Sequence, residues 1–263
     1  MTTDPGGPVL RNRFGADVPA PADDRTCRCF DQYRVSRRRK VRFHTELQDT
    51  SAPGWLHLLA LVEEAAADGR EEFHPLRELS PAERAEVITL PPSIARLTAV
   101  RTFNLYGSAL VRIPPEIGAM TALEEFTPYT SYRLHWYPYE LTRCRNLRRS
   151  TVSTRALFGN ENIRPPFPAL DGGPHPAGAA DPGVGGGALR TCSVCDRALD
   201  GGAVHQVWIS LRVATDVLPL LVNACSAACV AALPAPPEGY PATPHRGGPE
   251  LVQPVAEDDE RYW

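Results

Sequence analysis

Long apolar runs are missing from this 263-residue sequence: no segment approaches the roughly 18 consecutive apolar residues that a membrane-spanning helix needs. An excess of one charge is missing too, because 28 basic and 31 acidic residues give a net charge of −3. Such a chain has no overall field to attract nucleic acid or anionic lipid. The first residues also lack the apolar segment of a secretory signal. We therefore expect a cytoplasmic protein with no membrane partner.

Proline and glycine are abundant, with 27 and 20 residues, and their clusters mark segments that we expect to lie outside the folded cores. Between Arg164 and Arg190 there are six prolines and seven glycines in 27 residues, which is typical of a flexible linker. Such a linker would let the segments on either side fold independently. The composition predicts a disordered N-terminus at 1–24, a helical cap region at 25–89, repeats at 90–160, a linker at 161–190, a cysteine-rich module at 191–234 and a disordered acidic tail at 235–263.

Two helices are predicted in the cap region. Ser51 is the expected N-cap of the first, whose apolar residues then follow the 3.6-residue period until Gly69 ends it. The second begins at Ser80, because the tetrapeptide Ser-Pro-Ala-Glu combines a capping box with proline at the first helical position.

A sequence period of 23 to 24 residues follows. The segment LPPSIARL at 90–97 recurs as IPPEIGAM at 113–120 and as YPYELTRC at 137–144. This period indicates stacked turns, each with one short strand whose alternate side chains point into a common core. Cys144 is in phase with Leu97 and Met120, so we expect it to be buried rather than nucleophilic. Ser150 occupies an apolar position and weakens the third turn.

The segment 90–160 resembles leucine-rich repeats of the bacterial 23-residue type. The resemblance implies an α/β fold, a short solenoid closed by an N-terminal helical cap, that binds protein or peptide partners with the outward strand residues of its concave face. By register, these residues are Thr102, Asn104, Tyr106, Glu125, Thr127, Tyr129, Arg149 and Thr151. Trp136, in an aromatic cluster beside the second repeat, is a further candidate for the interface or else fills an irregular turn. Arg112 is expected on the convex side.

Four of the seven cysteines form two short-spaced pairs, Cys192-x2-Cys195 and Cys225-x3-Cys229. Zn²⁺ favours four such thiolates in a tetrahedron. Between the pairs, two β-rich runs flank 214–216 and predict a hairpin, and 226–233 predicts a short helix. This order resembles a treble-clef zinc finger, although Asp196 follows the first pair in place of the usual glycine. We expect one structural zinc ion, because four thiolates leave no open coordination position.

Together these patterns favour a non-enzymatic protein-interaction protein. Two alternatives remain open: a zinc- or thiol-dependent enzyme or effector, in which Cys27 and Cys29 take part, and a nucleic-acid-binding regulator that uses the basic run Arg37–Lys40. Near-neutral charge and the lack of interleaved aromatic residues argue against nucleic acid. The sequence does not indicate the oligomeric state.

Overall fold

The computed structural model describes residues 44, 46–170, 175–176, 190–199 and 203–255. Its α-helices are α1 (Pro53–Asp68), α2 (Pro81–Glu86) and α3 (Ala227–Ala231). Its strands are β1 (Glu72–Phe73), β2 (Thr102–Asn104), β3 (Glu125–Thr127), β4 (Tyr137–Pro138), β5 (Arg149–Ser150), β6 (His175–Pro176), β7 (Ala203–Val213) and β8 (Asp216–Ala224). Five 3-10 helices complete the set: η1 (Pro75–Arg77), η2 (Pro92–Arg96), η3 (Pro115–Ala119), η4 (Tyr139–Arg143) and η5 (Thr154–Ala156). Within these described ranges, no helix is both long and apolar enough to cross a membrane.

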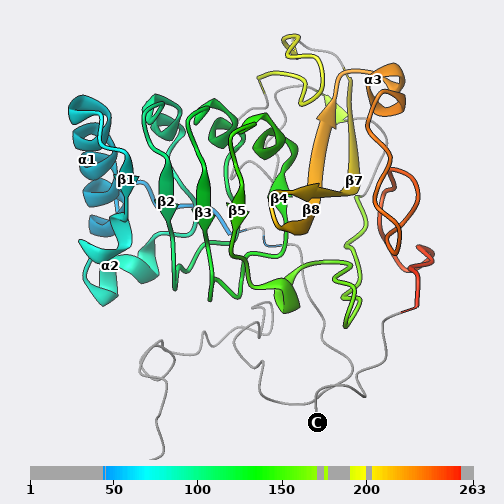
Figure 1. Ribbon diagram of the computed structural model, residues 1–263, viewed down its shortest axis with the longest axis horizontal. Helices are drawn as coiled ribbons and strands as arrows, with labels where there is room; N and C mark the ends of the chain where they lie inside the picture. Colours follow the sequence, from blue (N-terminus) through cyan, green and yellow to red (C-terminus); the bar gives the residue numbers. More distant parts are fainter. Residues whose placement is uncertain (1–43, 45, 171–174, 177–189, 200–202, 256–263) are drawn as a thin grey trace, which may run out of the picture.

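Four short strands form a parallel sheet in the order β1-β2-β3-β5, which Figure 1 shows side by side. We call these strands and the 3-10 helices between them the strand stack. Thr102 pairs with Glu125 and Glu125 with Arg149, while Asn104 pairs with Thr127. The register expected from the 23- to 24-residue period is therefore confirmed.

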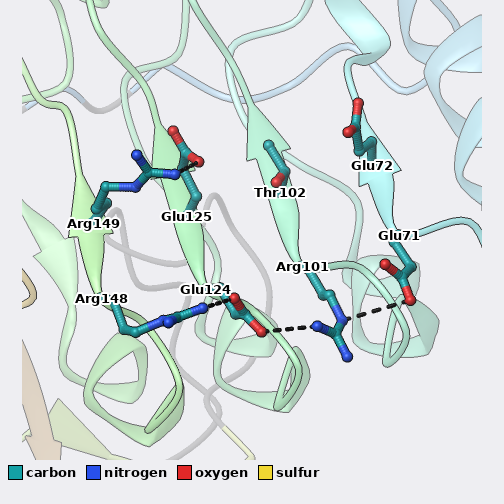
Figure 2. Close-up of a pocket in the computed structure, with 8 residues that line it drawn as sticks. All are labelled: Glu71, Glu72, Arg101, Thr102, Glu124, Glu125, Arg148 and Arg149. Atoms are coloured by element: carbon teal, nitrogen blue, oxygen red, sulfur yellow. Dashed lines mark hydrogen bonds and ion pairs between the residues drawn. The ribbon is translucent and has the colours of Figure 1, made fainter.

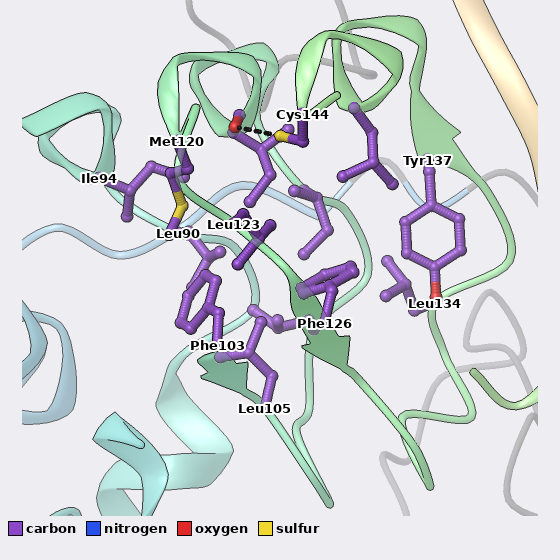
Figure 3. Packing of buried hydrophobic residues seen from close by; sticks show 14 of the residues in the cluster. Leu90, Ile94, Phe103, Leu105, Met120, Leu123, Phe126, Leu134, Tyr137 and Cys144 are labelled. Atoms are coloured by element: carbon purple, nitrogen blue, oxygen red, sulfur yellow. Dashed lines mark hydrogen bonds between the residues drawn. The ribbon is translucent and has the colours of Figure 1, made fainter. Parts of the chain in front are cut away.

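The inward side chains of the strand stack form columns of like residues (Figure 3). Phe73, Phe103 and Phe126 follow one another with ring centroids 5.6 and 5.9 Å apart, and all three are buried. The 3-10 helices approach closely, since a Cβ on Gly118 would lie 2.7 Å from the backbone oxygen of Glu140. Cys144 is buried as expected, and burial raises the pKa of its thiol to about 12.

Helices α1 and α2 cover the β1 end of the strand stack. The capping box of α2 is confirmed: the Ser80 hydroxyl accepts from the Glu83 amide, and the Glu83 carboxylate accepts from the Ser80 amide. The expected cap of α1 was wrong. Its N-cap is Ala52, and the Glu86 carboxylate accepts a hydrogen bond from the Gly54 amide at 2.7 Å. A carboxylate that is 32 residues away in the sequence thus satisfies this helix end.

The other end of the strand stack is closed by an antiparallel hairpin of β7 and β8. We call residues 190–199 and 203–233 the hairpin unit. Tyr137 and Pro138 of β4 pair in parallel with Leu220 and Leu221 of β8. The hairpin turn also covers the edge of β5, because the Thr215 hydroxyl donates to the Ser150 carbonyl at 2.7 Å. Ser150 breaks the phenylalanine column where the strand stack ends and the hairpin unit begins.

A second set of buried side chains joins segments that are far apart in the sequence. This aromatic cluster consists of Trp136, Phe158, Phe167, Leu170, Trp208 and Leu221, with Leu251 packed against it. Trp208 and His245 exchange two backbone hydrogen bonds, 2.7 and 3.0 Å long. The amide of Leu170 donates to the carbonyl of Arg246.

These contacts correct three expectations about domain organisation. Part of the predicted linker, residues 161–170, is placed in the fold, because Phe167 and Leu170 are buried in the aromatic cluster. Part of the predicted tail, residues 235–255, is placed as well, because Leu251 packs against this cluster and His245 pairs with Trp208. The hairpin unit is not independent of the strand stack, since one continuous core runs from Leu58 in α1 to Ala224 in β8. The predicted disordered segment 1–24 lies outside the described residues.

Candidate metal centre and polar sheet face

Four cysteine side chains converge at one end of the hairpin unit. Cys192 and Cys195 lie in the turn before β7, Cys225 directly follows β8, and Cys229 is in the first turn of α3. The hydroxyl of Ser226, the N-cap of α3, accepts a hydrogen bond from the Cys229 amide. Because this cap begins the helix immediately after Cys225, the chain turns and brings Cys229 beside it.

The sulfur positions suit a single tetrahedral ion. All four Sγ atoms lie within 4.8 Å of one another. The Sγ atom of Cys225 is 3.7 Å from that of Cys195 and 3.5 Å from that of Cys229. Zn–S bonds of about 2.3 Å in a tetrahedron place the sulfurs about 3.8 Å apart. The four cysteines are free thiols, so they could hold a metal ion.

Hydrogen bonding divides the cysteines into unlike groups. Burial raises the pKa of the Cys192 thiol, but backbone N–H groups of Cys195, Val194 and Cys225 outweigh it and lower this pKa to about 7. Hydrogen bonds with the thiols of Cys229 and Cys195 raise the pKa of Cys225 to about 12. The Cys192 thiol therefore ionises at a lower pH than the Cys225 thiol, and the thiolate is the form in which cysteine binds a metal ion.

A residue of the strand stack holds the turn around the first cysteine pair. Asp196 has φ of 60°, in the left-handed region that usually requires glycine. Its carboxylate forms an ion pair with Arg143 of η4, with an N···O distance of 2.5 Å. The same guanidinium donates to the carbonyl oxygens of Ser193 and Cys192, at 2.9 and 3.5 Å. The residue that takes the left-handed conformation is thus held by an ion pair from outside the hairpin unit.

The outward side chains of the strand stack form a second candidate site, which we call the polar sheet face. Its first two rows line a groove of about 360 Å³ and consist of Glu71, Glu72, Arg101, Thr102, Glu124, Glu125, Arg148 and Arg149 (Figure 2). Two consecutive residues share this face at each strand because two successive amides donate to one carbonyl of the preceding strand. The amides of Arg101 and Thr102, for example, both donate to Glu71. This two-against-one pairing is typical of a β-bulge.

Ion pairs run across the groove from strand to strand. Arg101 lies 3.6 Å from Glu71 and 3.1 Å from Glu124, and Glu124 also pairs with Arg148. In the next row Arg149 pairs with Glu125 at 2.8 Å. The outermost charges are the most exposed: the side chain of Glu72 is 76% exposed and that of Arg148 is 74% exposed.

Two tyrosines lie at the far end of the polar sheet face. Tyr106 and Tyr129 are 50% and 45% exposed, and their ring centroids are 6.1 Å apart. The amide of Gly107 donates to the carbonyl of Tyr129, so the strand pairing continues to this point. The expected neighbouring and exposed tyrosines are therefore confirmed.

The predicted site residues divide clearly. The four cysteines come together. Five of the nine interface candidates pair in the expected strand register: Thr102, Asn104, Glu125, Thr127 and Arg149. Tyr106 and Tyr129 are neighbours at the end of the same face, and the Thr151 amide donates to the Phe126 carbonyl. Trp136 does not lie on this face, because it is 3% exposed and packs edge-on against Trp208. Arg112, expected on the convex side, is buried and donates to the backbone carbonyls of His44 and Glu46. Cys27, Cys29 and the run Arg37–Lys40 lie outside the described residues.

Sequence reasoning missed three contributors to these sites. Arg143 and Thr215 were missed because their partners are about 50 and 65 residues away in the sequence. The first charged row was missed although Arg101, Glu124 and Arg148 recur with the 23- to 24-residue period. That alternation of sign was the signal that could have indicated it.

A scan of the sequence against models of protein families finds no match, and a search of curated proteins finds none either. The inferences about function therefore rest on the chain's own residues.

Proposed function

We propose that this protein is a non-enzymatic interaction protein of the leucine-rich-repeat type, with a zinc-stapled module at one end. The repeat assignment is supported by the 23- to 24-residue spacing of paired residues on β2, β3 and β5. It is also supported by a 3-10 helix before each of these strands and by the polar ladder in which the hydroxyls of Ser108 and Ser131 lie 2.5 Å apart.

In this proposal the metal is Zn²⁺ and its role is structural. Four thiolates complete a tetrahedral shell, so no position remains for a reacting water. The donor atoms are soft sulfurs, which favour zinc over magnesium or calcium. The ion would join the turn at Cys192 to the start of α3 within the hairpin unit, and Arg143 of the strand stack contacts the same turn. We expect about one zinc ion per chain in the purified protein.

The polar sheet face is the proposed binding surface for a protein partner. The observation that carries this proposal is the exposed pair Tyr106 and Tyr129, which stands at the end of a charged groove. Tyrosine contributes strongly to protein interfaces because it buries a large ring and keeps a polar group at its tip. The charged rows would set the orientation of the partner.

The test is a double variant, Tyr106→Ser with Tyr129→Ser, used as bait in a native lysate beside the wild type. Partners that bind the wild type should lose about 2 kcal/mol, or about 30-fold in affinity, when both rings are removed. A matched control removes two exposed apolar side chains elsewhere, Leu47→Ser with Leu56→Ser, which are 65% and 53% exposed. Equal retention of every partner by both double variants would contradict the proposed surface.

A further inference from the structure

The charges of the polar sheet face change sign from one edge of the sheet to the other. Along the first row, Glu71, Arg101, Glu124 and Arg148 alternate as minus, plus, minus and plus, in the strand order β1-β2-β3-β5. In the second row the edge residues are again opposite, with Glu72 on β1 and Arg149 on β5. The face therefore has an acidic edge and a basic edge, both largely exposed.

A surface of this kind is complementary to itself. A two-fold axis that runs parallel to the strands, between β2 and β3, would place β1 of one copy over β5 of another, and β2 over β3. Glu71 would then face Arg148 and Glu72 would face Arg149. Each Arg101 would face a Glu124, so every position of the first row meets the opposite charge. The same operation brings Tyr106 of each copy over Tyr129 of the other.

We propose that the partner of the polar sheet face is a second copy of this chain, in an isologous two-fold dimer. This inference rests on the proposed function, because it uses the same surface and names its occupant. The sign reversal argues for a second copy, since an unrelated partner places no such symmetry requirement on the face.

The dimensions of the face predict a transient dimer. The face spans four strands about 4.8 Å apart. On its two central strands it extends over six residues, from Arg101 to Tyr106 and from Glu124 to Tyr129, which gives an area on the order of 400 Å² per copy. Stable interfaces bury about 800 Å² per partner. Exposed ion pairs add little affinity but exclude wrong orientations, and the four tyrosine rings supply the apolar contact. Association should therefore weaken strongly as the salt concentration rises.

Two charge-reversal variants test the proposal by complementation. One carries Glu71→Arg and Glu72→Arg, and the other carries Arg148→Glu and Arg149→Glu. Each variant alone would place like charges opposite one another, so its dimerisation constant should fall by more than about tenfold. In an equal mixture the reversed edges face each other, and a heterodimer should form with nearly the wild-type constant.

Sedimentation equilibrium at low and at physiological salt, at concentrations up to about 1 mM, provides the measurement. The control variant, Glu63→Arg with Glu64→Arg, makes the same charge change as the first variant on exposed residues of α1 and should dimerise as the wild type does. Circular dichroism of every variant confirms that it is folded, since the changed side chains are exposed.

The outcomes separate this inference from the proposed function. A mixture that associates while its components do not would support the dimer. A wild type that remains monomeric at low salt, or a mixture that fails to associate, would overturn it. If the wild type is monomeric but still captures a lysate partner that the tyrosine double variant loses, the proposed function stands and its partner is a different protein.

Discussion

In the strand stack, buried side chains recur with a spacing of 23 or 24 residues, as Leu97 and Met120 or Leu123 and Leu147 do. Phe103 and Phe126, for example, are neighbours in one column. The aromatic cluster has no such regularity, because Trp136, Phe167 and Trp208 come from three segments separated by 31 and 41 residues. The core of the strand stack therefore consists of side chains that recur with the sequence period, whereas the aromatic cluster consists of side chains from distant segments.

The difference shows how a short stack can end. Its β1 end is covered by α1 and α2, which lie next to it in the sequence. Its β5 end is closed by the hairpin unit, which returns from beyond residue 190 and pairs β8 with β4. Arg143 and Thr215 then connect the two regions by polar contacts. We infer that the strand stack and the hairpin unit unfold together rather than as separate domains.

The largest expected effect comes from the aromatic cluster. Trp208→Ala removes a fully buried ring that contacts Trp136, Phe158 and Phe167, so it should cost about 3–5 kcal/mol of unfolding free energy. Urea unfolding followed by circular dichroism should show one transition at a lower midpoint. A second transition, in which the strand stack unfolds at its wild-type midpoint, would show that the strand stack and the aromatic cluster unfold independently.

In the strand stack, the corresponding change is Leu105→Ala. Leu105 is fully buried, and its truncation should cost about 2–5 kcal/mol. The adjacent variant Tyr106→Ala is the control: its ring points outward, so it should change the unfolding free energy by less than about 1 kcal/mol. Similar costs for the two neighbours would mean that the inward and outward positions are wrongly assigned.

Acid should weaken the fold through two histidines, His135 and His245, which pack against Phe158 and Phe167 of the aromatic cluster. Burial lowers the pKa of His135 to about 3 and that of His245 to about 4, below the value of about 6.5 in an unfolded chain. The unfolded state therefore binds more protons, so stability is complete above pH 6.5 and falls as the pH is lowered. At pH 5 His135 alone should account for a loss of about 2 kcal/mol. The variant His135→Gln, unfolded in urea at pH 7 and pH 5, should show a smaller loss than the wild type.

The smallest of these effects concerns the connection between the regions. Arg143→Met keeps the apolar stem but removes the guanidinium from Ser193, Cys192 and Asp196, and should cost about 1.5 kcal/mol. Competition with a chelator should also show weaker zinc binding. Arg145→Met, at an exposed position two residues away, should leave both quantities unchanged.

The parts predicted from the sequence are those with local or periodic signals. The spacing of Phe103 and Phe126 predicted the strand register, and the spacing of the cysteines predicted that the four thiols lie close together. The capping box at Ser80 needs only four consecutive residues.

The parts that were missed depend on partners distant in the sequence. Prolines around Phe167 are typical of a linker, and only the Trp208 ring and the segment at His245 show why that stretch is packed. Arginine side chains usually lie at the surface, yet Arg112 is buried, and its guanidinium donates to the carbonyls of His44 and Glu46. Neither the packing of Phe167 nor the burial of Arg112 can be predicted from the residues of a single helix or strand.

Urea unfolding of the wild type, with zinc release and circular dichroism recorded on the same samples, tests whether the metal centre and the strand stack unfold together. A colorimetric chelator reports the zinc, and the helical part of the far-ultraviolet signal comes mainly from the 16-residue helix α1 at the β1 end of the strand stack. We expect about one zinc ion per chain, released with the same midpoint at which the circular dichroism is lost. Two results would contradict this expectation. One is the absence of zinc from freshly purified protein, and the other is release of zinc at low urea while the circular dichroism signal remains that of the native protein.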